Sequence, residues 1–161
     1  MAFISDFGIA CALPMVGWAA LSLSAAAFAQ AQPQAQGLKT MDVQVEIVGL
    51  RDARGMVQLC LTRDSKSFPD CKAGSSVHAT IKAGHGSLHH TFVSVPSGTY
   101  AIAAFHDANG DGKLNTMMGI PKEGFAFSRN PAVRARAPRF NEASFESNGR
   151  SLAPLKMKYL L

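Results

Sequence analysis

Side chains with oxygen ligands alternate along the segment HDANGDGKLN, in the second half of the chain. Asp107, Asn109 and Asp111 occupy positions 1, 3 and 5 of the calcium-loop template D-x-[DN]-x-[DN]-G, and a glycine fills position 6. Lys113 would provide its backbone carbonyl at position 7, and Asn115 a side-chain oxygen at position 9. Carboxylate, amide and carbonyl oxygens are the ligands that Ca²⁺ prefers, so this spacing predicts calcium as a cofactor of the loop.

The last ligand of the template is missing. Position 12 is Met118, which cannot supply the bidentate carboxylate of an EF-hand, and the nearest later carboxylate is Glu123. With so few anionic ligands we expect weak binding, with a dissociation constant of about 10⁻⁴–10⁻³ M. The alternative is a tight turn without metal, because Asn-Gly and Asp-Gly favour turns in which glycine adopts a positive φ.

Two aromatic residues, Phe125 and Phe127, follow the loop and would share one face of an extended segment. Together with Arg129 they would offer a stacking platform and a cation to an envelope glycan. The alternative places the two rings in the core beneath the loop. The chain shows no nucleophile elbow, no catalytic-triad context and no phosphate-cradling glycine loop, so we expect a protein that is not an enzyme.

The elements that must position these residues are strands, because apolar and polar residues alternate with a period of two after residue 40. We expect a hairpin-like connection from Gly49 to Gly55 and a turn at Asn148-Gly149. The pattern predicts an all-β fold, a single antiparallel β-sandwich that is immunoglobulin-like or prealbumin-like. One long loop, roughly residues 107–142, remains, and we expect any site to lie there. About seven strands are predicted, within residues 41–50, 55–62, 76–83, 87–95, 98–106, 143–147 and 152–160.

The N-terminal segment has the features of an export signal. Residues 7–29 contain no charged side chain, and they end in Ala27-Phe28-Ala29, which has the form of a signal-peptidase site. We therefore predict a signal peptide over residues 1–29, cleavage after Ala29, a polar linker over 30–39 and a β-sandwich domain over 40–161. The alternative is an uncleaved membrane anchor, since the segment is long enough to span a bilayer. Cleavage would yield a soluble periplasmic or secreted protein.

Cysteine use agrees with export. Cleavage would remove Cys11 and leave Cys60 and Cys71. An even pair in an oxidising compartment predicts one disulfide, which would fasten an excursion back onto the strand from which it leaves. Two buried free thiols are the alternative.

The chain is moderately basic, with 16 Lys and Arg against 11 Asp and Glu and a formal net charge of +5. Part of the excess lies in a segment that contains Arg129, Arg134, Arg136 and Arg139. Such a segment suits an anionic envelope surface or glycan, or forms a solvated basic loop. We expect no nucleic-acid partner, because export argues against one and no aromatic pattern of a nucleic-acid module accompanies the arginines.

Residues 95–131, VPSGTYAIAAFHDANGDGKLNTMMGIPKEGFAFSRNP, resemble the signature region of an exported family, the domain of unknown function 2141. The resemblance extends loosely over residues 41–160. It implies one small β domain after a signal peptide. It assigns no catalytic residue to this chain, since the family has no established activity. Asn115 departs from the family pattern, in which Asp is frequent at this position, and this weakens the calcium prediction. The resemblance implies that the motif residues form a structural region that also binds a ligand. These residues are His106, Asp107, Asn109, Asp111, Gly112, Lys113, Gly119, Ile120, Pro121, Lys122, Glu123 and Gly124.

These observations together predict a non-catalytic binding or structural module of the bacterial envelope. The first part of its long loop, residues 107–123, would be fastened by weakly bound calcium. The second hypothesis is a module that binds carbohydrate or an envelope polymer through Phe125, Phe127 and Arg129.

Overall fold

The computed structural model describes residues 39–71, 74, 76–133, 136–148 and 151–161. The predicted signal peptide, and all of the predicted linker except Lys39, lie outside the described residues. All described residues belong to one compact unit, residues 36–161. Its elements are β1 (Thr40–Val48), β2 (Met56–Thr62), β3 (Ser76–Lys82), β4 (Leu88–Pro96), β5 (Gly98–Asp107), β6 (Thr116–Met117), β7 (Ile120–Pro121), β8 (Gly124–Phe127), α1 (Phe140–Ala143), β9 (Phe145–Ser147) and β10 (Ser151–Lys156).

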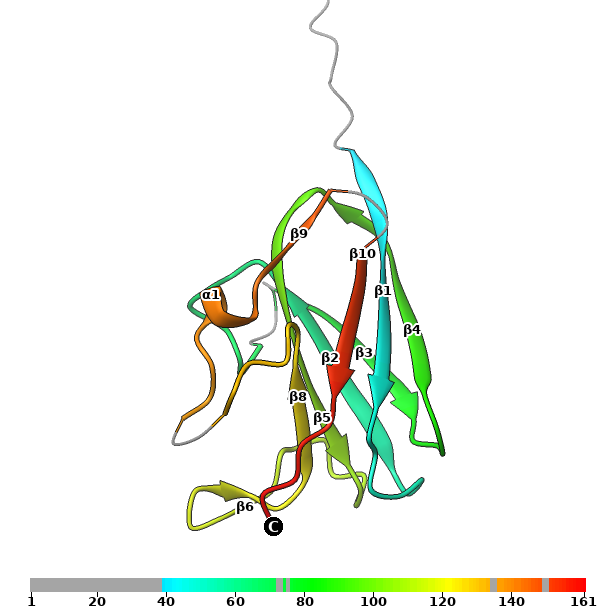
Figure 1. The fold of residues 1–161 in the computed structure, drawn as a ribbon, viewed down its shortest axis with the longest axis vertical. Coiled ribbons are helices and arrows are strands. Elements are labelled where there is room, and N and C mark those ends of the chain that lie inside the picture. Colours follow the sequence, from blue (N-terminus) through cyan, green and yellow to red (C-terminus); the bar gives the residue numbers. More distant parts are fainter. Residues whose placement is uncertain (1–38, 72–73, 75, 134–135, 149–150) are drawn as a thin grey trace, which may run out of the picture. The chain divides into compact units, whose positions relative to one another are not determined.

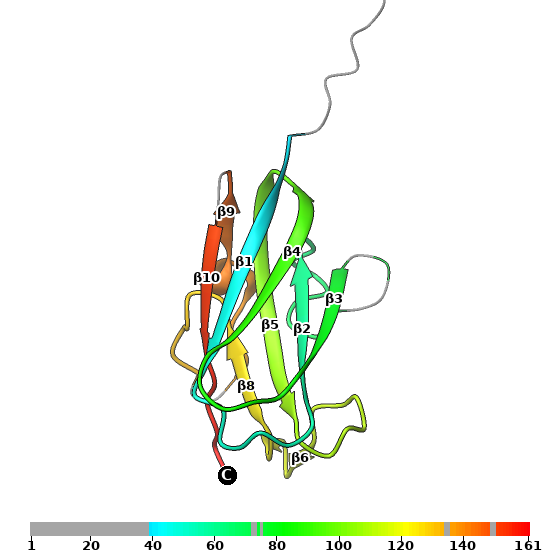
Figure 2. The same ribbon diagram turned by 90° about the vertical axis from the view of Figure 1, so that its right-hand side faces the viewer.

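Two sheets pack face to face and confirm the predicted all-β sandwich (Figures 1 and 2). The first sheet has the strand order β10-β1-β4. The second has the order β3-β2-β5-β8, and β9 pairs with the beginning of β5. The short strands β6 and β7 form a separate hairpin in the long loop. Helix α1 has four residues, and among the described residues no helix is long and apolar enough to cross a membrane.

Two predicted features of strand pairing are wrong. The segment from Gly49 to Gly55 is not a hairpin connection, because β1 and β2 lie in different sheets. Gly149 of the predicted Asn148-Gly149 turn lies outside the described residues; of the strands beside it, β9 pairs with β5 and β10 with β1. The sandwich is also not purely antiparallel, because β10 runs parallel to β1. Alternation along a strand shows which face is buried, but it carries no information about the neighbouring strand.

The inner faces of the two sheets form the main core, as the alternation predicts. Val43, Val45 and Ile47 of β1 are buried there, and they face apolar residues of the second sheet such as Leu59 and Ile102. The sandwich is thus held chiefly by burial of these inward-facing side chains, each of which contributes about 1.5–3 kcal/mol relative to an exposed position.

The outer face of the second sheet carries a second apolar cluster. Phe125 and Phe127 of β8 meet Ala101 of β5 there, and Phe68 and Ala143 pack against them from outside the sheet. Residues 63–71, which follow β2, and helix α1 lie on this side of the sheet (Figure 1). Residues 124–127, which the sequence pattern predicts to lie in the long loop, instead form a strand paired with β5, because this cluster buries the Phe125 and Phe127 side chains.

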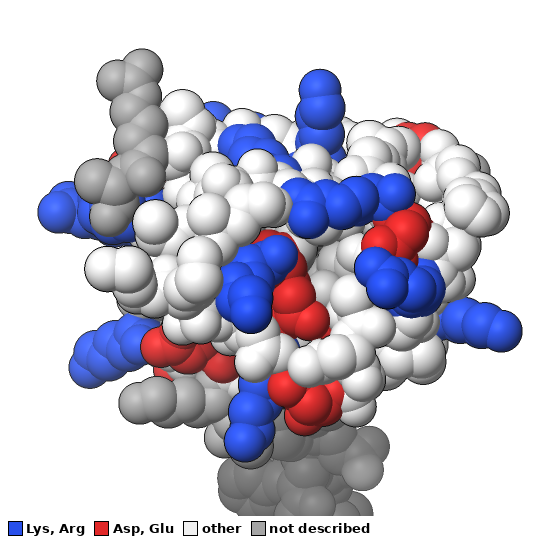
Figure 3. Space-filling model, turned by 90° about the horizontal axis from the view of Figure 1, so that it is seen from below, with Lys and Arg blue, Asp and Glu red and all other residues white. Residues whose placement is uncertain are grey.

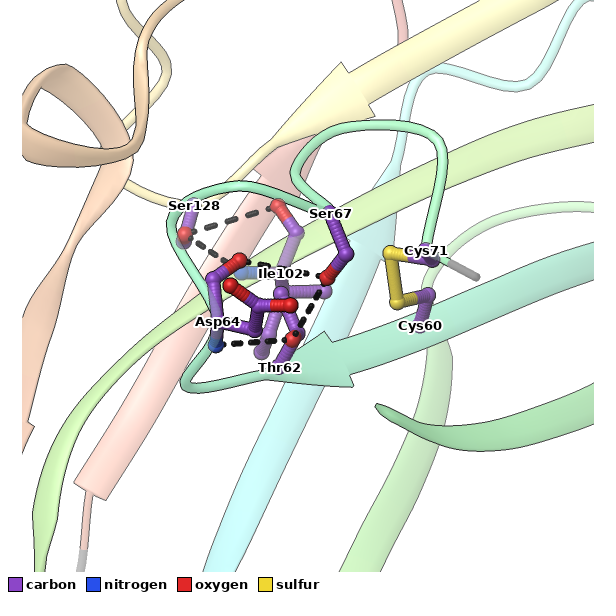
Figure 4. The surroundings of a disulfide bond; sticks show 7 residues. All are labelled: Cys60, Thr62, Asp64, Ser67, Cys71, Ile102 and Ser128. Carbon is purple, nitrogen blue, oxygen red and sulfur yellow. Dashed lines mark hydrogen bonds between the residues drawn. A yellow bond between two sulfur atoms is a disulfide. The ribbon is translucent and has the colours of Figure 1, made fainter. Parts of the chain in front are cut away.

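The predicted disulfide is confirmed between Cys60 and Cys71. The two Cα atoms lie 6.2 Å apart, which is within the usual range for a disulfide. The bond closes the excursion that leaves β2, and the Asp64 N–H, which donates to Thr62 Oγ1 at 3.0 Å, orders the start of this excursion (Figure 4). A bridge over a loop of this size typically stabilises a domain by about 2–4 kcal/mol.

The two ends of the sandwich differ in what they carry. Strand β1 begins at one end, while the C-terminus and the β6–β7 hairpin lie at the other (Figures 1 and 2). The first part of the long loop, residues 107–123 with the hairpin, therefore projects from the end opposite to the beginning of the domain.

Candidate functional site

Asp107 organises the loop that follows β5. Its side chain is only 1% exposed, and its two carboxylate oxygens accept four hydrogen bonds. The N–H groups of Gly110 and Asp111 donate to Oδ1 at 2.8 and 3.0 Å. The N–H of Gly112 donates to Oδ2 at 2.9 Å, and Gln58 Nε2 of β2 donates to the same oxygen at 3.3 Å. The first residue of the calcium template is therefore the acceptor around which the turn is built.

Glu123 closes the loop by folding back onto its beginning. Its side chain is buried, and Oε1 accepts a hydrogen bond from the N–H of Ala108 at 3.2 Å while Oε2 accepts one from the N–H of Asn115 at 2.9 Å. The backbone of Lys122 also donates to the carbonyl of Asn115 at 2.9 Å. One carboxylate thus joins the start, the middle and the end of the loop.

Asp111 is exposed at the centre of the loop and is surrounded by amides. Its Oδ2 accepts hydrogen bonds from Asn109 Nδ2 at 2.9 Å and Asn115 Nδ2 at 2.8 Å, and Oδ1 accepts one from the N–H of Lys113 at 2.9 Å. These bonds, chiefly those from Asn115 and Asn109, lower the pKa of Asp111 below its ordinary value. Among the described residues, no group of three or more His, Cys, Asp or Glu side chains lies close enough together to hold a metal ion.

A polar network at the base of the loop connects it to the C-terminal segment that follows β10. His106 is buried; its Nε2 lies 2.8 Å from the carbonyl of Arg54 and its Nδ1 lies 2.9 Å from the Tyr159 hydroxyl. Because the carbonyl only accepts, Nε2 donates to it, and in the neutral imidazole Nδ1 accepts a hydrogen bond from the Tyr159 hydroxyl. The N–H of Arg51 in turn donates to the Tyr159 hydroxyl at 3.0 Å. Gly124 permits this packing, since a Cβ atom there would lie 2.4 Å from the Tyr159 ring.

The β6–β7 hairpin projects from the loop. Met117 pairs with Ile120, so Met118 and Gly119 form its two-residue turn. Leu114, Met117, Met118 and Ile120 are all exposed, and Met118 is 97% exposed. The residue at position 12 of the calcium template therefore lies at the tip of a hairpin.

Phe125 and Phe127 share the outer face of β8, as predicted, but they are only 4% and 9% exposed. Their ring centroids lie 5.8 Å apart, and Phe68 packs edge-on against Phe127. Arg129 is exposed, and its Nη1 donates to the carbonyl of Ser144 at 3.3 Å. The structure does not bring the three residues together as an open platform, so this geometry does not favour glycan stacking, and glycan binding stays a prediction.

A groove of about 940 Å³ lies over the uncovered part of this outer face. Its floor comes from β2, β5 and β8 and includes Cys60, Ala103, Phe105, Phe125 and Phe127. Its walls are the disulfide-closed excursion, the part of the long loop that carries the hairpin, the residues Val133, Arg136 and Ala137, and Leu160 near the C-terminus. The volume is in the range of small-molecule sites, and most of the floor is apolar.

Three charged residues line the groove, namely Lys113, Arg136 and Asp70. Arg136 is held by Glu142 through two hydrogen bonds of 2.9 and 2.8 Å, which lower the pKa of Glu142 to about 2. Among the described residues the salt bridges are Arg136–Glu142 and Arg54–Asp52, so Lys113 lines the groove without an ion pair to that part of the chain. The groove therefore combines an apolar floor with a basic group from each of two walls and one acidic group.

Most residues of this groove lie outside the predicted site. Ala103 and Phe105 lie in the run of β5 from Ala101 to Phe105 in which every residue is apolar, and Cys60 lies between Leu59 and Leu61. Consecutive apolar residues in a strand indicate that both of its faces are covered. That signal was present and predicts apolar surface on the outer face of the second sheet.

Comparison with known families gives one result. The family model described as an uncharacterized protein conserved in bacteria, DUF2141, matches residues 45–153. Comparison with curated proteins and with solved structures finds no match. The matched region covers most of the sandwich, from within β1 to within β10, and includes the whole loop that Asp107 and Glu123 organise. The chain therefore belongs to the DUF2141 family of uncharacterized proteins conserved in bacteria.

Proposed function

We propose that this protein is a non-catalytic binding module of the periplasm or the extracellular medium that holds a single-chain anionic amphiphile in the groove. The groove over β2, β5 and β8 supports the proposal, because it is large enough for such a ligand and its floor is built from apolar side chains. A straight apolar chain would cover Phe105 and Ala103, which the fold leaves only half-buried.

The charges around the groove favour an anionic head group. Lys113 on the loop wall makes no ion pair with the rest of the described chain, and Arg136 is held in place on the opposite segment by Glu142. Asp70 is the acidic residue of the lining. A carboxylate or phosphate close to Lys113 would gain a charge-assisted hydrogen bond, whereas a sugar would leave the apolar floor uncovered.

Palmitate tests this proposal as a probe. Titration calorimetry with the purified protein is expected to show saturable binding with a negative heat-capacity change, because apolar surface is buried. Ala103→Trp fills the middle of the floor, where Ala103 pairs with Cys60 and Phe127, and is expected to weaken binding at least about tenfold. Leu152→Trp, at an exposed position on β10 outside the groove, is the matched control.

Two results would contradict the groove as the site. One is the absence of saturable palmitate binding to the wild-type protein. The other is equal affinity of the wild-type protein and a folded Ala103→Trp variant, with folding checked by near-ultraviolet circular dichroism.

Calcium at the loop is a second proposal, favoured by the convergence of amides on Asp111. Asn109 and Asn115 both direct Nδ2 at its carboxylate. Rotating each amide by half a turn would present two further oxygens beside those of Asp111, at the loss of the bond from the Asp111 N–H to Asn109 Oδ1. The site would then have few charged ligands, which fits weak affinity.

Millimolar Ca²⁺ is therefore expected to raise the melting temperature of the protein. At ten times the dissociation constant the stabilisation would be about 1.4 kcal/mol. Asp111→Ala is expected to abolish the increase, while Asp70→Ala, an exposed carboxylate outside the loop, should keep it. A melting temperature that does not change across millimolar Ca²⁺ would exclude calcium from the loop.

A further inference from the structure

The tip of the β6–β7 hairpin places a methionine, Met118, in a left-handed backbone conformation that is unfavourable for its side chain. Met118 and Gly119 have φ values of 52° and 79°, and two positive values are typical of a type I′ turn. Asn or Asp usually precedes the glycine there, because a left-handed conformation is unfavourable for most side chains. Met118 is also 97% exposed, so its side chain gains no burial within the described part of the domain. A contact outside the domain would explain its presence.

The neighbouring apolar side chains are exposed as well. Of the nine exposed large apolar residues in the described part of the chain, four lie within residues 114–120, namely Leu114, Met117, Met118 and Ile120. A concentration of apolar surface on a projecting hairpin, as opposed to single exposed residues, indicates an interaction site.

Two lysines flank this apolar tip. Lys113 precedes β6 and Lys122 follows β7, and neither belongs to the salt bridges found among the described residues. The nearby carboxylates are engaged by the loop itself: Glu123 is buried against two backbone N–H groups, and the exposed Asp111 accepts bonds from two amides. Lys and Arg side chains lie around this end of the domain, and Asp and Glu side chains lie between them (Figure 3).

We propose that the β6–β7 hairpin docks the protein on an anionic lipid bilayer. Met117, Met118 and Ile120 enter the boundary between head groups and acyl chains, and Lys113 and Lys122 contact the head-group phosphates. Apolar side chains flanked by lysines, whose long stems reach back to the polar layer, are suited to this interface. The hairpin also forms part of the groove wall, with Lys113, Met118 and Ile120 in the lining, but docking needs no amphiphile in the groove.

Vesicle flotation with the compact unit, residues 36–161, tests the docking. This unit holds both core clusters and every described strand, and it lacks the apolar N-terminal segment, which could bind lipid by itself. We expect it to float with vesicles of equal parts phosphatidylcholine and phosphatidylglycerol, and to bind pure phosphatidylcholine at least about tenfold more weakly.

Met118→Asn separates docking from folding. Asn suits the first position of a type I′ turn, so this variant is expected to melt a few degrees higher while its vesicle affinity falls at least about tenfold. Leu152→Asn removes an exposed apolar side chain from β10 and should bind vesicles like the wild type. Lys113→Gln combined with Lys122→Gln is expected to remove the preference for anionic vesicles.

The proposal is overturned if the wild-type unit does not float with the mixed vesicles, or if Met118→Asn floats as well as the wild type. Loss of flotation in Leu152→Asn to the same extent as in Met118→Asn would also overturn it, because the effect would then not be specific to the hairpin.

Discussion

Replacing Gly55 by alanine is expected to lower the free energy of unfolding by more than about 4 kcal/mol, a loss that few single substitutions cause. A Cβ atom at this position would lie 2.0 Å from the backbone oxygen of Asp107 and 2.8 Å from the Cα of Ala108. Both are backbone atoms of the β5 end and the loop, so no side-chain rotation relieves the contact. Gly55 also has a φ of 69°, and its carbonyl accepts a hydrogen bond from the Ala83 N–H at 3.1 Å.

Gly86→Ala is the matched control for this substitution. Gly86 has a similar φ of 78°, but a Cβ atom there would meet nothing within 4 Å. Only the cost of the left-handed conformation then applies, which is about 1–2 kcal/mol. Urea unfolding of both variants measures the difference, and equal losses at the two positions would show that the close approach to Asp107 does not constrain the fold.

Asp107→Ala is expected to destabilise the domain by about 2–4 kcal/mol. The substitution removes the acceptor for the N–H groups of Gly110, Asp111 and Gly112 and for the side chain of Gln58. Hydrogen bonds to a charged group are worth about 1.5–3 kcal/mol each, and solvent at the exposed glycines recovers part of the loss. The measurement is equilibrium unfolding in the presence of a chelator, so that calcium does not contribute.

Asp111→Ala provides the comparison within the same loop. Its carboxylate is exposed, and water can replace it at the amides of Asn109 and Asn115, so we expect a loss below about 1 kcal/mol without calcium. If Asp107→Ala were harmless in chelator and destabilising only with Ca²⁺, Asp107 would act as a metal ligand and the proposed structural role would be wrong.

The strands could be predicted from the sequence, whereas most of their partners could not. The alternate positions of Val43, Val45 and Ile47 predict a strand with one buried face, and the three side chains are buried as expected. The same alternation is compatible with any neighbouring strand, so it does not distinguish a hairpin from the observed connection, in which residues 49–55 cross between the two sheets. The disulfide was predictable, since Cys60 and Cys71 are the pair that export would leave.

The loop shows a different limit of sequence reasoning. Oxygen-bearing residues at alternate positions have the same pattern whether they bind an ion or accept backbone hydrogen bonds, and in this structure Asp107 does the second. Gln58 contributes from β2, far away in the sequence, so no local pattern could have included it. The return of Glu123 depends equally on tertiary structure, because β8 must pair with β5 before residue 123 lies beside Ala108.

The beginning of β1 and the β6–β7 hairpin lie at opposite ends of the sandwich (Figures 1 and 2). Strand β1 has nine residues and therefore spans roughly 30 Å. A bilayer docked on the hairpin would thus lie about one strand length from Thr40, and the proposed docking contact would leave the beginning of the domain clear of the membrane surface.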